Sequence, residues 1–387
     1  MKEISSPTST GNEPSSGPAP FDFAPLNRVV FGVGVIARLG EFARELGTSR
    51  ALLVTDPGLE AAGHPQRAAQ VLREAGLDVR IFDSVDENPT TRHVGLGVDA
   101  AKDHRSDLLV AVGGGSAMDV AKGINFLLTN GGTMADYQGF GKATQPMLPS
   151  IGVPTTAGTG SEAQSFALIA DEQHHLKMAC GDRKAAFRVA VLDPELTVTQ
   201  PARVTAVTGI DAIAHAIESL VCTRANGLSR MFSAEAWRQL SPNFERVLTT
   251  SNDVFARGAM QLGAYLAGSA IENSMLGAAH ACANPLTAHY GITHGIAVGV
   301  MLPHVVRFNS SAADRSYSRF AGSAEQLAQS VAKWLQVAHL PNKLGDLGVA
   351  PSILPVLAEE AAAQWTARFN PRPVTEPDLL HLYEMAM

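Results

Sequence analysis

The sequence predicts an α/β domain with a mostly parallel sheet, followed by an all-helical domain. Up to about residue 199, short β-rich runs alternate with helical stretches, as in sheets flanked by helices. Beyond Gln200-Pro201 these runs give way to Ala-rich segments with helical periodicity. A chain of 387 residues with 45% hydrophobic residues is long enough for two ordinary domains with sizeable cores. We therefore expect an active site in the cleft between a Rossmann-like domain and a helical domain.

Three segments divide the chain. Residues 1–20 are rich in Ser, Pro, Gly and Thr and offer too few core residues to offset their ordering entropy, which predicts a disordered leader. A short transit segment is the alternative, but the lack of Arg argues against it. Residues 21–200 are assigned to a nucleotide-binding domain and residues 201–387 to a helical, metal-binding domain.

Six strands are predicted in the first domain. Leu108–Val112 is a continuous apolar run, as expected for a strand that is buried on both faces of a sheet. The predicted strands are Val29–Phe31, Ala51–Thr55, Val79–Phe82, Leu108–Val112, Ser150–Pro154 and Val189–Leu192.

The second domain is expected to contain helices only. The stretch from Gly258 to Ile271 is too short to span a bilayer and is bounded by charged residues, which predicts a buried helix. The helix-period segments are Ile210–Leu220, Ser233–Leu248, Ala256–Ala283, Gly295–Val300, Ala324–Gln336 and Pro355–Ala367.

Charge and cysteine content limit the classes of function. The net charge is −7 and no Lys/Arg run exceeds two residues, so nothing indicates a nucleic acid or an anionic membrane as partner. Cys180, Cys222 and Cys282 are isolated and odd in number, which is typical of a reducing compartment. The N-terminus has no apolar signal core. We expect a cytoplasmic homodimer.

A glycine turn follows the strand Leu108–Val112. Gly113, Gly114, Gly115 and Ser116 lead into a helical stretch that carries Asp119. Backbone N–H groups in such a turn can approach a phosphate, and the N-terminus of the helix favours the anion. A plain tight turn is the alternative. The turn lacks the G-x-G-x-x-G pattern, so it differs from an ordinary Rossmann fingerprint.

Asp56 follows the strand Ala51–Thr55 directly. A carboxylate at this strand end can accept hydrogen bonds from an adenosine ribose and would repel a 2′-phosphate. Alternatively, Asp56 is a turn residue, because Asp-Pro-Gly is a turn sequence.

A group of Asp and His side chains points to a metal. Asp211 and His215 are four residues apart in an apolar helical stretch, so they lie on the same helix face. His280 and His294 occur in nearly uncharged stretches, where an unpaired His is costly. Together the four side chains form a nitrogen/oxygen set that suits a divalent transition metal. A buried polar pair of Asp211 and His215 is the alternative.

From about Phe21 onwards the chain resembles the iron-containing, metal-dependent (group III) alcohol dehydrogenases. The resemblance depends on Gly113–Asp119, Pro154–Glu162, Asp193–Thr197, the pair Asp211/His215, and His280 fourteen residues before His294-Gly295. It implies that Asp211, His215, His280 and His294 bind the metal and that Asp56 discriminates between NAD and NADP. It further implies cofactor contacts at Asn88, Thr155, Thr156, Thr159 and Lys177.

The sequence departs from this family at one position. Many members carry a histidine four residues after the third ligand, and Asn284 stands there in this chain. Asparagine can hydrogen-bond to a hydroxyl group but cannot exchange a proton near neutral pH. His289 lies in the same segment and, like water, could take over the proton transfer. Asn284 and His289 are therefore the predicted catalytic side chains.

The expected activity is hydride transfer between NAD(H) and a small alcohol or aldehyde, assisted by Fe²⁺ or Zn²⁺. Two alternatives remain. Cyclases of the dehydroquinate-synthase kind share the two-domain scaffold but differ in their ligand signature. The second alternative is a non-catalytic, nucleotide-binding relative, which the presence of Asn284 suggests.

Overall fold

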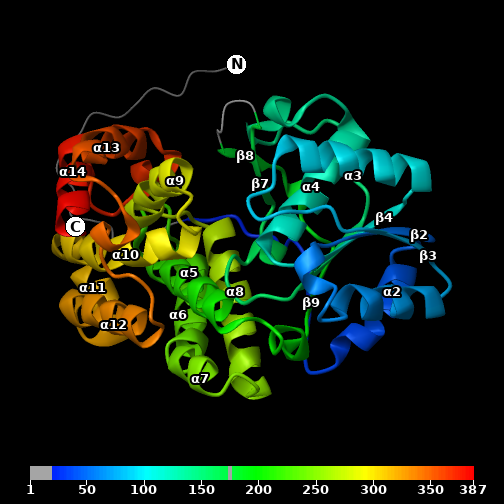
Figure 1. The fold of residues 1–387 in the computed structure, drawn as a ribbon, viewed down its shortest axis with the longest axis horizontal. Helices are drawn as coiled ribbons and strands as arrows, with labels where there is room; N and C mark the ends of the chain where they lie inside the picture. The colour runs from blue at the N-terminus through cyan, green and yellow to red at the C-terminus, as the bar shows by residue number, and fades with distance from the viewer. Residues whose placement is uncertain (1–19, 173–176) are drawn as a thin grey trace.

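The computed structural model describes residues 20–172 and 177–387. The leader expected over residues 1–20 therefore lies outside the described residues, apart from Pro20. The α/β domain and the helical domain lie side by side, as predicted (Figure 1).

All six predicted strands are present and form one parallel sheet. Its order is β1-β9-β6-β4-β2-β3, and the strands are β1 (Arg28–Phe31), β2 (Arg50–Val54), β3 (Asp78–Phe82), β4 (Leu108–Gly113), β6 (Ser150–Pro154) and β9 (Val189–Leu192). Helices cover both faces of the sheet: α1 (Leu39–Glu45), α2 (His64–Glu74), α3 (Thr91–His104) and α4 (Gly115–Asn130).

Alternate residues of β4 enter two different cores. Leu109 and Ala111 pack into the core that includes residues of α3 and α4, whereas Val110 and Val112 pack into the core on the α1 and α2 side. Every residue of β4 is buried, which confirms the prediction for a continuous apolar strand. The chain leaves this rigid central strand at the glycine turn.

A second, three-stranded sheet was not predicted. It contains β5 (Gly139–Phe140), β7 (Phe166–Ala170) and β8 (Lys177–Gly181), in the order β5-β8-β7. β5 has only two residues, and β7 and β8 contain a single β-branched residue, Ile169, between them. Their sequences therefore carry little strand signal. This small sheet matters because β7 borders the cavity described below.

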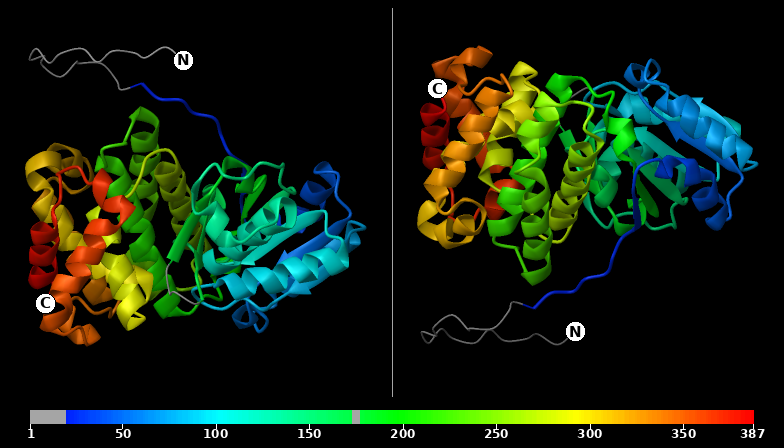
Figure 2. Two further views of the ribbon diagram at one scale, coloured as in Figure 1. Left: turned by 90° about the horizontal axis from the view of Figure 1, so that it is seen from above. Right: turned by 90° about the horizontal axis from the view of Figure 1, so that it is seen from below.

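The helical domain is built around α5 (Ala202–Val221), which is buried along most of its length. The other helices are α6 (Gly227–Leu240), α7 (Phe244–Thr249), α8 (Val254–Glu272), α9 (Ala278–Tyr290), α10 (His294–Phe308), α11 (Ser310–Ala321), α12 (Ala324–Val337), α13 (Leu354–Ala363) and α14 (Glu376–Met385). Figure 2 shows from two further sides that these helices pack together beside the α/β domain.

Several predicted helix boundaries were wrong. The segment 233–248 is divided between α6 and α7, and the segment 256–283 between α8 and α9. The second break falls at Asn273–Gly277, where Asn273 caps α8 and Gly277 precedes α9. The last predicted helix ends at Ala363 and is followed by a short 3-10 helix, η9 (Trp365–Phe369). α11 and α14 were not predicted.

α5 is long and apolar enough, by composition alone, to cross a membrane. However, 89% of its most apolar window is buried inside the protein. We therefore interpret α5 as a core helix.

Candidate active site

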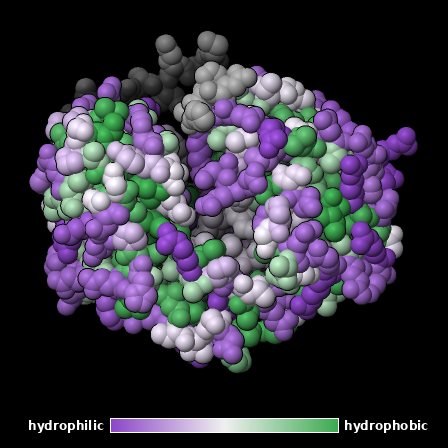
Figure 3. Space-filling model, in the orientation of Figure 1, coloured by the Kyte–Doolittle hydropathy of each residue, from purple (hydrophilic) through white to green (hydrophobic). Residues whose placement is uncertain are grey.

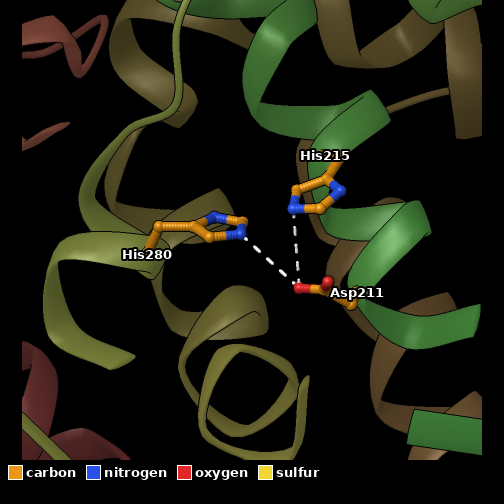
Figure 4. A group of neighbouring side chains, drawn as sticks. All are labelled: Asp211, His215 and His280. Atoms are coloured by element: carbon orange, nitrogen blue, oxygen red, sulfur yellow. Dashed lines mark ion pairs between the residues drawn. The ribbon is translucent and has the colours of Figure 1, made fainter. Parts of the chain in front are cut away.

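The four predicted metal ligands converge from three helices. Asp211 and His215 stand one turn apart on α5, His280 lies in the first turn of α9, and His294 is the first residue of α10. The Nε2 atoms of His215 and His280 each lie 3.6 Å from Asp211 Oδ1, and that of His294 lies 3.9 Å away. Figure 4 shows the imidazoles of His215 and His280 directed at one oxygen of Asp211. We call these four side chains the Asp–His group.

The chemistry of this group fits a divalent cation. Possible ligand atoms of Asp211, His215 and His280 all lie within 4.8 Å of one another, and these residues are at most 6% exposed. Asp211 Oδ1 and His280 Nε2 are buried, and neither has a hydrogen-bond partner among the described residues. Such orphaned polar atoms are costly unless something binds them. A cation among the Asp–His group would satisfy both.

Glu218 orients His280 and was missed in the sequence. His280 Nδ1 lies 2.5 Å from Glu218 Oε2, and the second carboxylate oxygen accepts a hydrogen bond from the Ala279 N–H at 2.8 Å. Because a carboxylate can only accept, Nδ1 carries a proton, and Nε2 is the ring nitrogen that faces Asp211. This is the arrangement by which outer carboxylates fix metal-binding imidazoles. Positions 211, 215 and 218 lie on one face of a helix, and this spacing could have identified Glu218 from the sequence.

The electrostatics of the group favour metal-binding protonation states at three of the four side chains, Asp211, His215 and His294. Burial lowers the pKa of His215 to about 4 and that of His294 to about 3, so both imidazoles are neutral at pH 7. Burial opposes ionisation of Asp211, but the adjacent His215 and His280 outweigh it and hold the pKa of Asp211 below its usual range. At His280, the nearby carboxylates of Asp211 and Glu218 outweigh the effect of burial and raise the pKa to about 9, so metal binding displaces a proton from this imidazole.

One cavity of about 610 Å³ connects the Asp–His group to the glycine turn. It is lined by Asp211, His215, His280 and His294 on the helical side. Gly114, Gly115 and Ser116 line it on the side of the α/β domain. The molecular surface is hollowed where the two domains meet (Figure 3). The expected cleft between the domains is therefore present.

The glycine turn joins β4 to α4 as predicted. A Cβ atom on Gly115 would lie 2.8 Å from Thr159 Cγ2, so only glycine leaves this face of the turn open. Five further predicted cofactor residues also line the cavity, namely Asn88, Asp119, Thr156, Thr159 and Lys177. The first N–H groups of α4 thus face a cavity large enough for part of a dinucleotide.

Three predicted cofactor residues do not line the cavity. Asp56 is half-buried at the end of β2, and one of its oxygens would lie 3.3 Å from a Cβ on Gly113. Burial raises the pKa of the Asp56 carboxyl group. Thr155 is buried, and its N–H donates to the Gly113 carbonyl. Asp56 and Thr155 therefore lie next to Gly113, the first residue of the turn, and none of the three faces the cavity.

Two buried side chains of α4, Asp119 and Lys122, hold the start of this helix in position. Lys122 was not predicted as a site residue from the sequence. Asp119 accepts hydrogen bonds from Ser161 Oγ at 2.7 Å and from the Leu168 N–H at 3.2 Å. The fully buried ammonium of Lys122 donates to Ser161 O and Oγ and to Phe166 O. The carboxylate of Asp119 is thus committed to positioning α4 against β7. Asp119 and Lys122 are three residues apart on a helix, and this spacing could have identified Lys122 from the sequence.

The two predicted catalytic side chains are not brought into the cavity. The Asn284 amide donates to Gln364 Oε1 at 3.0 Å. His289 is exposed at the end of α9, where its Nε2 lies 2.9 Å from Glu360. α9 places His289 nine residues, or two and a half turns, beyond His280, on another side of the helix. The geometry therefore gives no support to a proton route through His289.

Comparisons with known proteins agree with this site. Residues 26–194 match the family described as iron-containing alcohol dehydrogenase, and residues 205–387 match the C-terminal part of the same family. A NAD-dependent methanol dehydrogenase from Bacillus methanolicus is 34% identical over 371 residues, covering 92% of this chain and 97% of that protein.

Solved structures are similar over nearly the whole chain. A 1,3-propanediol oxidoreductase superimposes with a TM-score of 0.93 at 33% identity and covers 95% of this chain and 100% of that one. A sulfoacetaldehyde reductase from Bifidobacterium kashiwanohense, solved with NAD⁺, gives a TM-score of 0.88 at 26% identity, covering 95% of this chain and 99% of that one. These matches favour a dehydrogenase over the cyclase and the non-catalytic alternatives. The chain belongs to the iron-containing alcohol dehydrogenase family.

Proposed function

We propose that this protein is a metal-dependent, NAD(H)-linked alcohol dehydrogenase that interconverts a small primary alcohol and its aldehyde. The observation that carries the proposal is the single cavity shared by the Asp–His group and the glycine turn. A dinucleotide at the turn and an alcohol at the Asp–His group would meet in that cavity, and proximity of this kind is a major source of rate acceleration.

The Asp–His group supplies the ligands for the cation. The neutral imidazoles of His215 and His294 and the carboxylate of Asp211 are ready to bind without losing a proton at pH 7, whereas His280 must lose one. Fe²⁺ or Zn²⁺ suits this donor set. When bound, such a cation acts as a Lewis acid on the substrate oxygen.

The α/β domain supplies the nucleotide site. Gly114, Gly115 and Ser116 present the N-terminus of α4 to a pyrophosphate. Bound NAD⁺ would supply the acceptor for the hydride of the carbinol carbon, and the hydroxyl proton would leave to solvent, so that alcohol and NAD⁺ would give aldehyde, NADH and H⁺. Lys177 lines the cavity, where burial lowers its pKa and the carboxylates of Asp119 and Asp211 oppose that effect.

Cofactor choice is assigned to Asp56. A carboxylate just after β2 would repel a 2′-phosphate bound beside it, which supports a preference for NAD(H) over NADP(H). Replacing Asp56 with Ala should narrow the ratio of kcat/KM for NADH and NADPH. An unchanged ratio would make Asp56 a turn residue only.

The remaining parts of the proposal concern partners and location. β1 is an edge strand of the sheet, and Val29, Phe31 and Val33 are exposed on and beside it. An exposed apolar edge supports a homodimer formed through β1, which light scattering of the purified protein can test.

The cysteines are free and buried, consistent with a cytoplasmic protein.

The decisive experiment compares metal-free and metal-loaded protein. We expect that chelation abolishes NADH-dependent reduction of acetaldehyde and that one equivalent of Fe²⁺ or Zn²⁺ restores it. Full activity without bound metal would contradict the proposal, and so would an inactive protein that carries one equivalent of either ion and binds NADH.

A further inference from the structure

The cavity has an apolar side that the hydride transfer does not use. Six side chains form it, and we call them the apolar wall: Phe166, Leu168, Ile271, Met275, Leu276 and Trp365. Phe166 and Leu168 come from β7 of the α/β domain, and the others come from the end of α8, the following loop and η9. The wall is therefore assembled from both domains.

An aromatic pair closes the wall across the domain boundary. The rings of Phe166 and Trp365 lie with their centroids 5.9 Å apart, although 199 positions separate them in the sequence. Aromatic pairs at such distances attract each other beyond their burial. Trp365 is nevertheless 40% exposed, so part of the indole remains free to contact a ligand.

The Phe166 ring is held in position by its strand neighbour. Phe166 stands opposite Gly181 in the β7–β8 ladder, and a Cβ atom on Gly181 would collide with the ring. On its other side the ring packs on Phe140, with centroids 5.6 Å apart. The glycine thus creates the space that the ring fills, and the ring is fixed before any substrate arrives.

Trp365 lies beside the metal-binding end of α9. The preceding residue, Gln364, accepts a hydrogen bond from Asn284, which stands one helical turn after His280. Met275 and Leu276 precede α9 by a few residues and approach the same end. A substrate whose oxygen lies at the Asp–His group would therefore extend its carbon chain along the apolar wall.

Three polar side chains near the wall, Gln164, Glu272 and Gln364, are held by hydrogen bonds to other residues. Both carboxylate oxygens of Glu272 accept hydrogen bonds from Ser165, one from its N–H and one from its hydroxyl group. The Gln164 amide donates to Thr159 O, and Gln364 accepts from Asn284. A hydroxyl group in the tail of a substrate would lose its water against the six apolar side chains of the wall, which is costly.

The cations of the cavity are also poorly placed for a charged substrate tail. Lys177 experiences the charges of two carboxylates, Asp119 and Asp211. Arg203 stands eight residues before Asp211 on α5, which is about 12 Å along the helix axis. Neither residue belongs to the apolar wall.

From these contacts we infer that Trp365 and Phe166 select substrates with an apolar chain, so that unbranched primary alcohols such as 1-butanol are preferred over diols and over alcohols with a charged tail. The inference is an extension of the proposed function, because it names the substrate class of the same site. It also explains how Asn284 contributes, by holding Gln364 and hence the Trp365 segment in place.

The test uses the metal-loaded protein and two substrates of equal size. 1-Butanol and 1,3-propanediol differ in having a methyl group or a hydroxyl group at the same place. We expect kcat/KM to be about 10-fold or more higher for 1-butanol. From ethanol to 1-butanol it should rise about fourfold with each methylene group. A diol preference, or a flat response to chain length, would overturn the inference.

Substitutions in the apolar wall test whether it causes the preference for 1-butanol. Trp365→Ala and Phe166→Ala should each lower kcat/KM for 1-butanol roughly 10-fold, while ethanol changes much less. Phe255→Ala is the matched control and should leave both substrates unchanged, because it removes an exposed ring that does not line the cavity. Equal losses for ethanol and 1-butanol in the Trp365 variant would contradict a role in selection.

A binding measurement separates this inference from the proposed function. Calorimetry with the unreactive amides butyramide and 3-hydroxypropanamide should show preferential binding of butyramide, and Trp365→Ala should remove the preference. If the loaded protein oxidises ethanol but shows neither preference, the inference fails and the dehydrogenase activity stands. If butyramide binds preferentially and no alcohol is oxidised, the proposed function fails instead.

Discussion

The Asp–His group and the glycine turn line the same cavity but are built in opposite ways. The Asp–His group uses four side chains from α5, α9 and α10, whose ligand atoms converge on one oxygen of Asp211. The glycine turn uses backbone N–H groups at the start of α4 and depends on missing side chains. One site requires certain atoms to be present, and the other requires atoms to be absent.

This difference determines how each site responds to change. Removing one metal ligand leaves buried polar atoms without a partner and eliminates a bound charge, so the effect should be nearly all-or-none. Adding an atom at the turn only displaces its neighbours, so the effect should be graded. The supports differ as well, because Glu218 orients a ligand directly whereas Asp119 and Lys122 position a whole helix.

The largest effect is expected for His280→Ala. This change should abolish stoichiometric metal binding and reduce kcat/KM below about one thousandth, because Lewis-acid catalysis is lost. Metal analysis of the purified variant and an NADH oxidation assay measure both. His289→Ala is the control, since His289 lies on the same helix, is exposed and pairs only with Glu360. One tightly bound ion per chain in the His280 variant would show that the Asp–His group is not the metal site.

Glu218→Gln should have the next largest effect. The amide keeps the shape of the side chain but no longer holds His280 with a charge, so metal affinity should fall about 10- to 100-fold. Competition with a chelator of known affinity gives the dissociation constant. Glu360→Gln changes a surface carboxylate that pairs with His289 of the same helix, α9, and should leave metal affinity unchanged. Equal affinities in all three proteins would show that Glu218 has no positioning role.

On the nucleotide side, Gly115→Ala should raise the KM for NADH by about 10-fold and leave metal content intact. The added Cβ would lie 2.8 Å from Thr159 Cγ2, so Thr159, which lines the cavity, would have to move and change the shape of the proposed nucleotide site. Gly95→Ala provides the comparison, because a Cβ there meets nothing within 4 Å. A lower metal content in the Gly115 variant would break the distinction between the two sites.

The smallest effect concerns Glu162, which is buried behind the glycine turn. Burial raises its pKa to about 7, from an ordinary value near 4.5. Between these values the folded protein binds more protons than the unfolded chain, so stability falls as pH rises. Glu162→Gln should remove this decline and gain up to about 3 kcal/mol over the wild type between pH 4 and pH 8. Urea unfolding of both proteins at pH 4 and pH 8 measures the difference in their free energy of unfolding. A difference that does not change with pH would contradict the raised pKa of Glu162.

The contrast between the sites also accounts for what the sequence could predict. Asp211, His215, His280 and His294 were predicted to form one group because such side chains are rare in apolar stretches, and the structure brings them together. The strands of the large sheet were found because short apolar runs between helical stretches are typical of buried parallel strands. The small sheet was missed because β5 is short and β7 and β8 carry little strand signal. Because β7 was not predicted, neither Phe166 nor the apolar wall to which it belongs could be predicted.

Residue roles that depend on long-range packing could not be predicted. The pair of Phe166 and Trp365 is invisible in the sequence, since nothing local relates the two positions. His289 was expected to take part in catalysis because it lies between two ligands, but sequence proximity ignores the direction in which a helix turns each side chain. Asn284 hydrogen-bonds to Gln364, a partner 80 residues away.

The central claim is that metal and nicotinamide meet in one cavity, and paramagnetic relaxation tests it most directly. Mn²⁺ accepts nitrogen and oxygen ligands and can replace the native ion. With one equivalent of Mn²⁺ bound, we expect strong broadening of the nicotinamide proton signals of NADH, and no such broadening in the His280→Ala variant. Stoichiometric Mn²⁺ in the wild-type protein, with bound NADH whose nicotinamide signals remain sharp, would contradict the account.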